Sequence, residues 1–326
     1  MHWFTFSFND FAVAFLSVLF EGVPFLLAGS LLSGFVDVFL SSERLARALP
    51  KNPIAAVLLS GLLGIFFPIC ECGSVVVIRR FIRKGLPISC AVTYMLAAPI
   101  VSPIVALSTL AAFKGRQAWP MTNLRMGIGY LVAIAAGMIV HRMRPSSIVR
   151  PEMLQETAPR KRAGFQIAAA PSASETQRDF SEIAAGASFS KKCLIAVQSA
   201  TADFLDVAFF FVVGIGIASL FNTAVNREII APFATNPALA IVVLMVLAAI
   251  VALCSTTSAF VAASFELFPP SAKLAFLTFG PVFDVKLFWL YGLIFRRRFV
   301  IILPICLFIV IAFICWRVSF VLDHAS

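Results

Sequence analysis

Charged residues are scarce in this chain of 326 residues: Asp, Glu, Lys and Arg together make up 13% of it, whereas apolar residues make up 60%. A soluble domain carries about 25% charged residues, so a soluble enzyme or a soluble binding domain is excluded. The alternating strands of about ten residues that build a membrane β-barrel are absent as well. Long apolar segments remain. They are expected to form membrane helices, because a helix satisfies its own backbone polar groups.

Other signals are missing too. Met1–Asp10 lacks the basic region of a signal peptide, so the first apolar segment is expected to stay in the protein. There is no GxxxxGK[ST] nucleotide-binding loop, and no cofactor is expected. The seven cysteines are odd in number and scattered, which is not typical of a disulfide framework. The net charge of +10 does not indicate nucleic-acid binding, because the basic residues cluster at the ends of apolar segments.

The length of the apolar segments predicts the fold class. About 20 apolar residues cross the hydrocarbon of a bilayer as a helix. We predict an all-α, polytopic membrane protein with about eight transmembrane helices, in two repeated four-helix halves that contain proline-broken helices. The predicted spans are residues 11–36, 53–80, 88–113, 122–141, 194–221, 237–264, 271–295 and 299–317.

The two halves repeat the same landmarks at an offset of 182 to 185 residues. A repeat that carries an intramembrane acid, a cysteine and prolines is typical of transporters built from two similar halves. Four crossings per half would give both halves one orientation, which we predict; a re-entrant segment in each half would invert them instead. The paired landmarks are Glu21 and Asp206, Gly29 and Gly214, Asn52 and Asn236, Pro53 and Pro237, Cys70 and Cys254, Pro87 and Pro269, and Pro99 and Pro281.

The chain divides into three parts: a first transmembrane repeat at 1–144, a linker at 145–192 and a second repeat at 193–326. The linker is rich in Pro, Ser, Ala and charged residues and has no amphipathic period, so we expect it to be flexible. Its basic ends favour the cytoplasm. The basic residues of the other loops are divided between the two sides, so the charge rule leaves the orientation open.

The strongest candidate site is the run Cys70-Glu71-Cys72. On an ideal helix the two cysteines diverge by about 200°. In an unwound stretch both sulfur atoms could face one solute, and thiols with a carboxylate suit a soft, thiophilic species. The alternative is that the cysteines are core residues and Glu71 pairs with a nearby arginine. We favour function, because charge at membrane depth is costly.

The matching run in the second half is Cys254-Ser255-Thr256-Thr257-Ser258. We predict that Cys254, Ser255 and Thr256 contact the solute, although Ser and Thr often bond only to their own helix. If the solute is a soft metal, its ligands would be Cys70, Cys72 and Cys254.

Proline and glycine interrupt the candidate spans and free backbone carbonyls there. Ser102 and Asp284 lie beside two of these interruptions and are predicted to contact the solute. Asp284 and Lys286 are two residues apart, so they are expected on different helix faces, and a pair between them is not assumed. The predicted helix breaks are Pro68, Gly73, Pro99, Pro103, Gly280 and Pro281.

Isolated charges in the apolar spans are candidates for coupling to protons or cations. Glu21 and Asp206 occupy matched positions, and Lys286 is the third candidate; an interhelical hydrogen bond is the alternative for the two acids. The small residues of the first span of each half are expected to permit close helix packing rather than to contact the solute: Ala28, Gly29, Ser30, Gly34, Gly214 and Gly216.

The segments PICECGSVVVIRRFIRKGLPISCAVTYMLAAPIVSPIV, ALCSTTSAFVAASF and LAFLTFGPVFDVKLFWLYGLIFRRR resemble the predicted permeases of the arsenical permease (ArsP-like) type. The resemblance is closer to the YcgR-like branch, which has Cys-Glu in the first motif. It implies export of trivalent organic arsenicals in the first group and a second membrane or lipoprotein-like subunit in the branch. This chain departs from the pattern at Thr256, Thr257 and Ser258, where relatives carry acids, and at Ser102, where they carry Asn. The loss of acids argues against a hard divalent cation.

These observations predict a multi-pass permease of the bacterial inner membrane that moves a small solute through a cavity between the two repeats. Efflux of a thiophilic metalloid, organoarsenical or metal species is the specific version. The alternatives are a membrane subunit of a two-component permease complex, which transports only with its partner, and a membrane thiol oxidoreductase using Cys70 and Cys72. The expected partners are membrane lipids, the solute, a second membrane subunit and a second copy of the chain.

Overall fold

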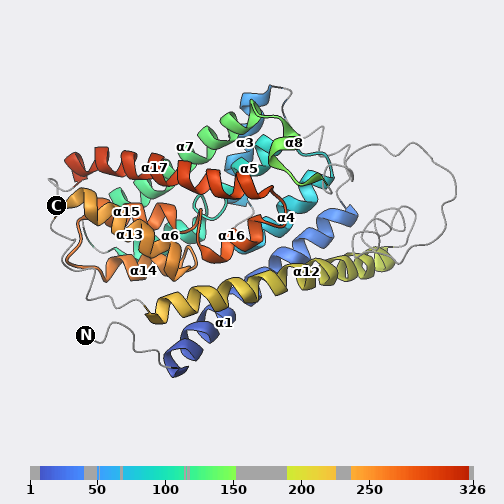
Figure 1. Cartoon of the computed structure of the whole chain (residues 1–326). Helices are drawn as coiled ribbons and strands as arrows, with labels where there is room; N and C mark the ends of the chain where they lie inside the picture. The colour runs from blue at the N-terminus through green and yellow to red at the C-terminus, as the bar shows by residue number, and fades with distance from the viewer. Residues whose placement is uncertain are drawn as a thin grey trace.

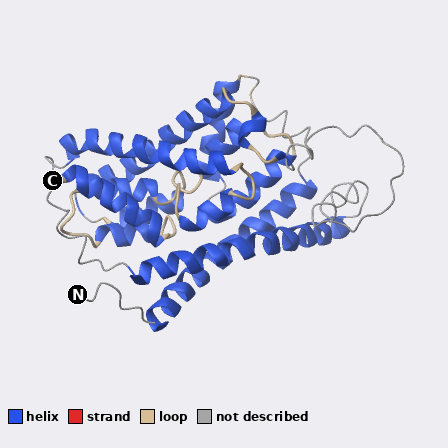
Figure 2. Cartoon of the chain, in the orientation of Figure 1, coloured by secondary structure: helices blue, strands red, loops and turns tan. Residues whose placement is uncertain are grey.

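The structure is a computed structural model that describes residues 8–39, 50, 52–66, 69–113, 115, 118–151, 189–224 and 236–322. In these ranges the chain is helical, and one isolated bridge between Val149 and Phe295 is its sole β-type pairing (Figure 2). The helices are α1 (Phe8–Phe39), α3 (Pro53–Phe66), α4 (Glu71–Arg83), α5 (Ile88–Ala97), α6 (Pro103–Ala112), α7 (Ala118–His141), α8 (Pro145–Ile148), α12 (Phe189–Ala224), α13 (Pro237–Val251), α14 (Thr257–Ala263), α15 (Pro270–Phe279), α16 (Val285–Tyr291) and α17 (Arg297–Leu322).

Four of the described helices are long and apolar enough to cross a membrane: α1, α7, α12 and α17. They coincide with the first and last predicted span of each half. The structure therefore supports a helical membrane protein. Each of the other four predicted spans is divided into two shorter helices, so each half contains one long helix, two divided segments and a second long helix.

The divided segments break where the sequence supplies a local cause. Pro103 is the first residue of α6, where a missing N–H costs nothing. Pro99 and Pro281 lie in the turns that follow α5 and α15, and Gly280 caps α15. Ala252 ends α13 in the left-handed conformation, with φ of 52°. This conformation costs a residue with a side chain about 1–2 kcal/mol.

Two predicted breaks have a different outcome. Gly73 is not a break, because α4 begins at Glu71 and Gly73 lies inside its first turn. There its N–H donates to Cys70 Sγ at 3.4 Å, which caps the helix. Pro68 lies outside the described residues.

The first divided segment of the first half folds back on itself. α3 runs in the same direction as α5, because Gly61 lies against Thr93 and Gly64 against Ala98. A short turn with Gly85 at φ of 90° joins the end of α4 to the start of α5. α4 therefore returns to the end of the molecule where α3 begins. The next segment continues through its break: along α7, Gly137 lies against Thr93 of α5, whereas Arg125 bonds Thr109 of α6.

The first divided segment of the second half folds back in the same way. α13 and α15 pack together with their C-terminal ends adjacent, as the contact of Gly280 with Ala248 shows. A short connection joins the end of α14 to the start of α15, so α14 returns toward the start of α13. The two hairpins, α3–α4 and α13–α14, enter from opposite ends of the molecule (Figure 1).

The predicted parallel arrangement of the halves is therefore wrong, and eight crossings are not confirmed. The equivalent helices α1 and α12 run in opposite directions, because Gly22 lies against Phe211 and Gly34 against Ala196. Two of the four divided segments fold back instead of continuing. Hydropathy shows that a segment is apolar but not whether the chain reverses within it, so the pattern of apolar segments could not distinguish the two arrangements.

α1 and α12 lie side by side and form a layer along one side of the other helices (Figure 1). Glycines of this layer allow close approach to neighbouring helices, as predicted for Gly29, Gly34 and Gly214, whereas the same prediction for Gly216 is wrong, because a Cβ there would meet nothing within 4 Å. Gly29 faces the backbone of Gly73 on α4, and Gly214 faces the backbone of Lys286 on α16. The layer therefore packs directly against α4 and α16, the second helices of two divided segments.

We expect Gly29→Ala to destabilise the protein, because the new Cβ would lie 2.7 Å from the Cα of Gly73. Overpacking of this kind costs about 1–3 kcal/mol. Gly216→Ala on α12 is the matched control, since a Cβ there meets nothing within 4 Å. Thermal unfolding of the purified proteins in detergent should show a lower midpoint for the first variant and no loss for the second. Equal midpoints would contradict the close α1–α4 contact.

Candidate functional site

The tips of the two hairpins meet at one small central pocket. Side chains from α1, α4, α12, α16 and the α13–α14 connection line it. The space is about 10 Å³, enough for about one water molecule. The lining residues are Val18, Glu21, Gly22, Phe25, Cys70, Glu71, Cys72, Phe211, Cys254 and Lys286.

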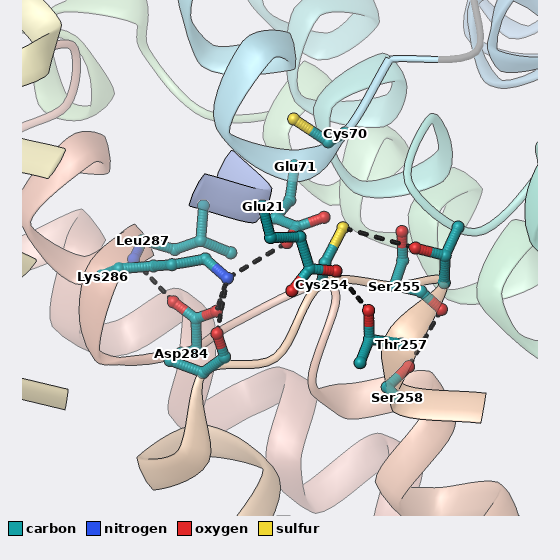
Figure 3. Close-up of polar contacts among 12 residues, drawn as sticks. Glu21, Cys70, Glu71, Cys254, Ser255, Thr257, Ser258, Asp284, Lys286 and Leu287 are labelled. Carbon is teal, nitrogen blue, oxygen red and sulfur yellow. Dashed lines mark hydrogen bonds and ion pairs between the residues drawn. The ribbon is translucent and has the colours of Figure 1, made fainter. Parts of the chain in front are cut away.

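A buried ion cluster occupies one wall of this pocket (Figure 3). Lys286 Nζ lies 3.1 Å from Glu71 Oε1 and 3.1 Å from Asp284 Oδ2. The same Nζ donates to the backbone carbonyl of Ala252 at 2.7 Å. All three charged side chains are at most 3% exposed. The cluster joins the tip of the first hairpin, the tip of the second hairpin and α16.

The pair between Asp284 and Lys286 corrects the expectation that these residues would lie on different faces. Asp284 is not inside the helix but caps its start, with φ of −146°. Its Oδ1 accepts from Leu287 N at 2.7 Å, which directs Oδ2 to Lys286. Helix geometry therefore does not apply to this residue. The alternative that Glu71 pairs with an arginine is wrong, because its ion-pair partner is Lys286.

The polar run after Cys254 forms the tip of the second hairpin. Thr256 donates to Cys254 Sγ at 3.7 Å, and Thr257 donates to Glu21. Ser255 contributes its carbonyl oxygen, which accepts from Arg125 Nη2 at 2.6 Å. The run thus closes the pocket toward α1 and holds the tip against α7.

Arg125 is a site residue that the sequence analysis does not single out, although it lies inside the predicted span 122–141. It is completely buried. Besides Ser255 it donates to Thr109 Oγ1 at 2.7 Å and to Ser258 Oγ at 3.3 Å. A charged residue seven positions after the start of an apolar helix is the feature that could identify Arg125.

The structure brings the three predicted cysteines together, since Cys70, Cys72 and Cys254 line the same pocket. They do not form a metal site as they stand. Within the described ranges no group of three His, Cys, Asp or Glu side chains is placed to hold a metal ion. The pocket therefore presents thiols beside charges, and no soft-metal ligand set.

Two predicted residues lie elsewhere. Ser102 is buried at the break before α6 and makes no side-chain capping bond. Asp206 pairs with Arg79 at 3.1 Å, away from the pocket, so Glu21 and Asp206 match in sequence but not in their surroundings.

The neighbouring pair of Arg80 and Asp203, at 2.8 Å, is buried and joins α4 to α12. The spacing of Asp203 and Asp206, which places both on one face of α12, is the sequence signal that could identify these two pairs.

We expect Lys286→Met to destabilise the protein by about 3–5 kcal/mol, because it leaves two buried carboxylates without their cation. The unfolding midpoint in detergent measures this effect. Adding Glu71→Gln and Asp284→Asn to the same protein should restore most of the loss. Lys273→Met, at a partly exposed lysine of α15, is the matched control and should change little. A midpoint for Lys286→Met equal to that of the control would contradict the ion cluster.

Comparison with known proteins places the chain in a family. It is 31% identical over 299 residues to the UPF0718 protein YcgR of Bacillus subtilis (strain 168), covering 91% of this chain and 92% of that one. It is 31% identical over 288 residues to a Streptococcus mutans protein, covering 88% and 87%, whose name provisionally describes it as a subunit of a two-component membrane permease complex. No solved structure matches. The family described as "Predicted permease" (ArsP_1) matches residues 7–319, and the chain belongs to this family.

Proposed function

We propose that this protein moves a small solute across the bacterial cell membrane through the central pocket. One observation carries the proposal: a hairpin tip from each half places three thiols and a buried ion cluster around one small pocket. Irregular backbone at membrane depth is tolerated only where protein or a cavity surrounds it. Broken helices that meet at the centre of two inverted halves are the usual binding site of secondary transporters.

The pocket in this conformation is closed. Its space of about 10 Å³ admits about one water molecule, whereas an organic solute needs a pocket of about 300 Å³ or more. Transport therefore requires the hairpin tips to separate. The Lys286 cluster joins the two tips, and the bonds of Arg125 and Thr257 hold the second tip against α7 and α1.

The chemistry of the lining suggests a thiophilic solute, with efflux of an organic metalloid as the specific case. Cys70, Cys72 and Cys254 line the pocket and offer soft contacts. The hydroxyl groups of Thr256 and Thr257 lie beside the lining, bonded to Cys254 and Glu21. The carboxylates beside them are already engaged by Lys286 or Thr257, so they do not form the open oxygen cage that a hard divalent cation prefers.

A second candidate is a subunit that transports only together with a partner. The provisional name of the Streptococcus mutans relative favours it. The uneven burial of the long helices is consistent with it, because 6% of the apolar window of α1 is buried inside the chain, against 39% to 44% for α7, α12 and α17. A second membrane protein or a second copy of the chain would then cover α1.

Flux into liposomes by the purified chain tests both candidates. A panel of trivalent organic arsenicals, soft metal ions and uncharged apolar controls would be offered. Flux of a thiophilic solute is expected, and Cys70→Ser or Cys254→Ser should lower it by about tenfold, the effect of losing a contact worth 1.4 kcal/mol. Cys306→Ser, at an exposed position of α17, is the matched control and should keep full flux.

Equal flux for wild type and both pocket variants would overturn the role of the thiols. Flux only after addition of a partner protein would favour the second candidate.

A further inference from the structure

The ion cluster at the pocket carries more acid than base. Lys286 has three N–H donors, and its three near partners are Glu71, Asp284 and the carbonyl of Ala252. Two carboxylates therefore share one ammonium in a region that is at most 3% exposed. If both were ionised, a full negative charge would remain buried, which costs several kcal/mol.

The surrounding charged groups do not cancel this excess. Glu21 on α1 adds a third carboxylate. Arg125 on α7 adds a second cation, which donates hydrogen bonds to the neutral groups of Thr109, Ser255 and Ser258. Three acids then face two bases. The other titratable groups that face Glu71 are neutral in their ordinary state: Cys70 and Cys72 beside it, Cys254 from the α13–α14 connection and Tyr291 from α16.

Two oxygen atoms mark where the missing positive charge belongs. Glu71 Oε2 and Asp284 Oδ2 are buried and, among the described groups, have no hydrogen-bond partner. Asp284 Oδ2 has the ion pair with Lys286, whereas Glu71 pairs with Lys286 through its other oxygen, Oε1. A carboxylate oxygen that bears a proton becomes neutral and no longer needs a counter-charge. The described residues offer no cluster that could hold a metal ion there, and the space admits about one water molecule.

We propose that Glu71 and Asp284 hold one exchangeable proton around Lys286, and that a proton on Glu71 releases the first hairpin so that the pocket opens. This inference rests on the proposed transport function. While the pocket is closed, the proton rests on Asp284. Its transfer to Glu71 Oε2 converts that carboxylate to a carboxylic acid, leaves Asp284 ionised, and breaks the ion pair of Glu71 with Lys286. Lys286 stays charged and keeps Asp284 as its partner. Return of the proton to Asp284 restores the pair of Glu71 with Lys286 and closes the pocket.

The geometry explains why this site, and not Asp206, carries the proton. Glu71 is the first residue of α4, whereas Lys286 lies on α16 of the second half. Their pair is therefore a direct bond between the two halves at the centre of the molecule. Asp206 has its own arginine, Arg79, and balances one charge with one charge.

Difference infrared spectroscopy of the purified chain in lipid, with no solute present, tests the proton directly. A carboxylic acid is detected by its C=O stretch at neutral pH. The band is expected in wild type and should disappear in Glu71→Gln and in Asp284→Asn, because removing either acid removes the excess charge. Asp206→Asn is the matched control and should keep the band. Absence of the band in wild type, or its persistence in both variants, would overturn the proposal.

Alkylation of Cys254 by a small maleimide, followed by mass spectrometry at one fixed pH, tests the opening. Glu71→Gln mimics the protonated acid and should raise the labelling rate several-fold over wild type and over Asp206→Asn. An unchanged rate would overturn the release of the hairpin. Both measurements need no transported solute, so they succeed or fail independently of the flux experiment. If the infrared band is present and no solute is carried, the proton site stands and the transport function fails.

Discussion

The contact of Lys286 with Glu71, Asp284 and the carbonyl of Ala252 is the constraint on which the central part of this protein depends. An ammonium group at membrane depth is expensive unless every donor is used. Here the donors reach three different elements: α4, the cap of α16 and the end of α13. The burial cost of one lysine thereby fixes the positions of both hairpin tips relative to α16, and with them the pocket.

The rest of the core supports this arrangement through backbone approach and buried polar bonds. Gly73 and Gly29 bring α4 against α1, and Gly214 brings α12 against α16. Arg125 holds the second tip by two bonds, to Ser255 and Ser258, and bonds α6 through Thr109, while the Arg80–Asp203 pair holds α4 to α12. These contacts are local and could break one at a time. Such an arrangement allows a hairpin to move while the four long helices keep their places.

The sequence predicted the composition of the site better than its geometry. The registry of Cys70 with Cys254 predicted that two similar segments would meet, and their side chains do line one pocket. It also predicted that Asp284 and Lys286 matter, because charge within an apolar segment is costly. The pairing of these two residues could not be predicted, since it depends on Asp284 lying before the helix rather than within it.

Neither the direction of the hairpins nor the burial of the arginines could be predicted from the sequence. Apolar content is the same for a segment that crosses and one that returns, so the reversal at Ala252 leaves no trace in hydropathy. Like topogenic charges, Arg79, Arg80 and Arg125 lie near the ends of apolar segments. Arg80 and Arg125 are nevertheless buried. Only contacts between distant parts of the chain, such as Asp203 with Arg80, distinguish a loop charge from a buried one.

An experimental structure of the protein in lipid with a transported solute bound would test the central claim most directly. The account predicts density for the solute between Cys70 and Cys254, with the tips of the two hairpins farther apart than in the closed pocket. Density on the outer face of α1 and α12, with the pocket still closed around Lys286, would contradict it.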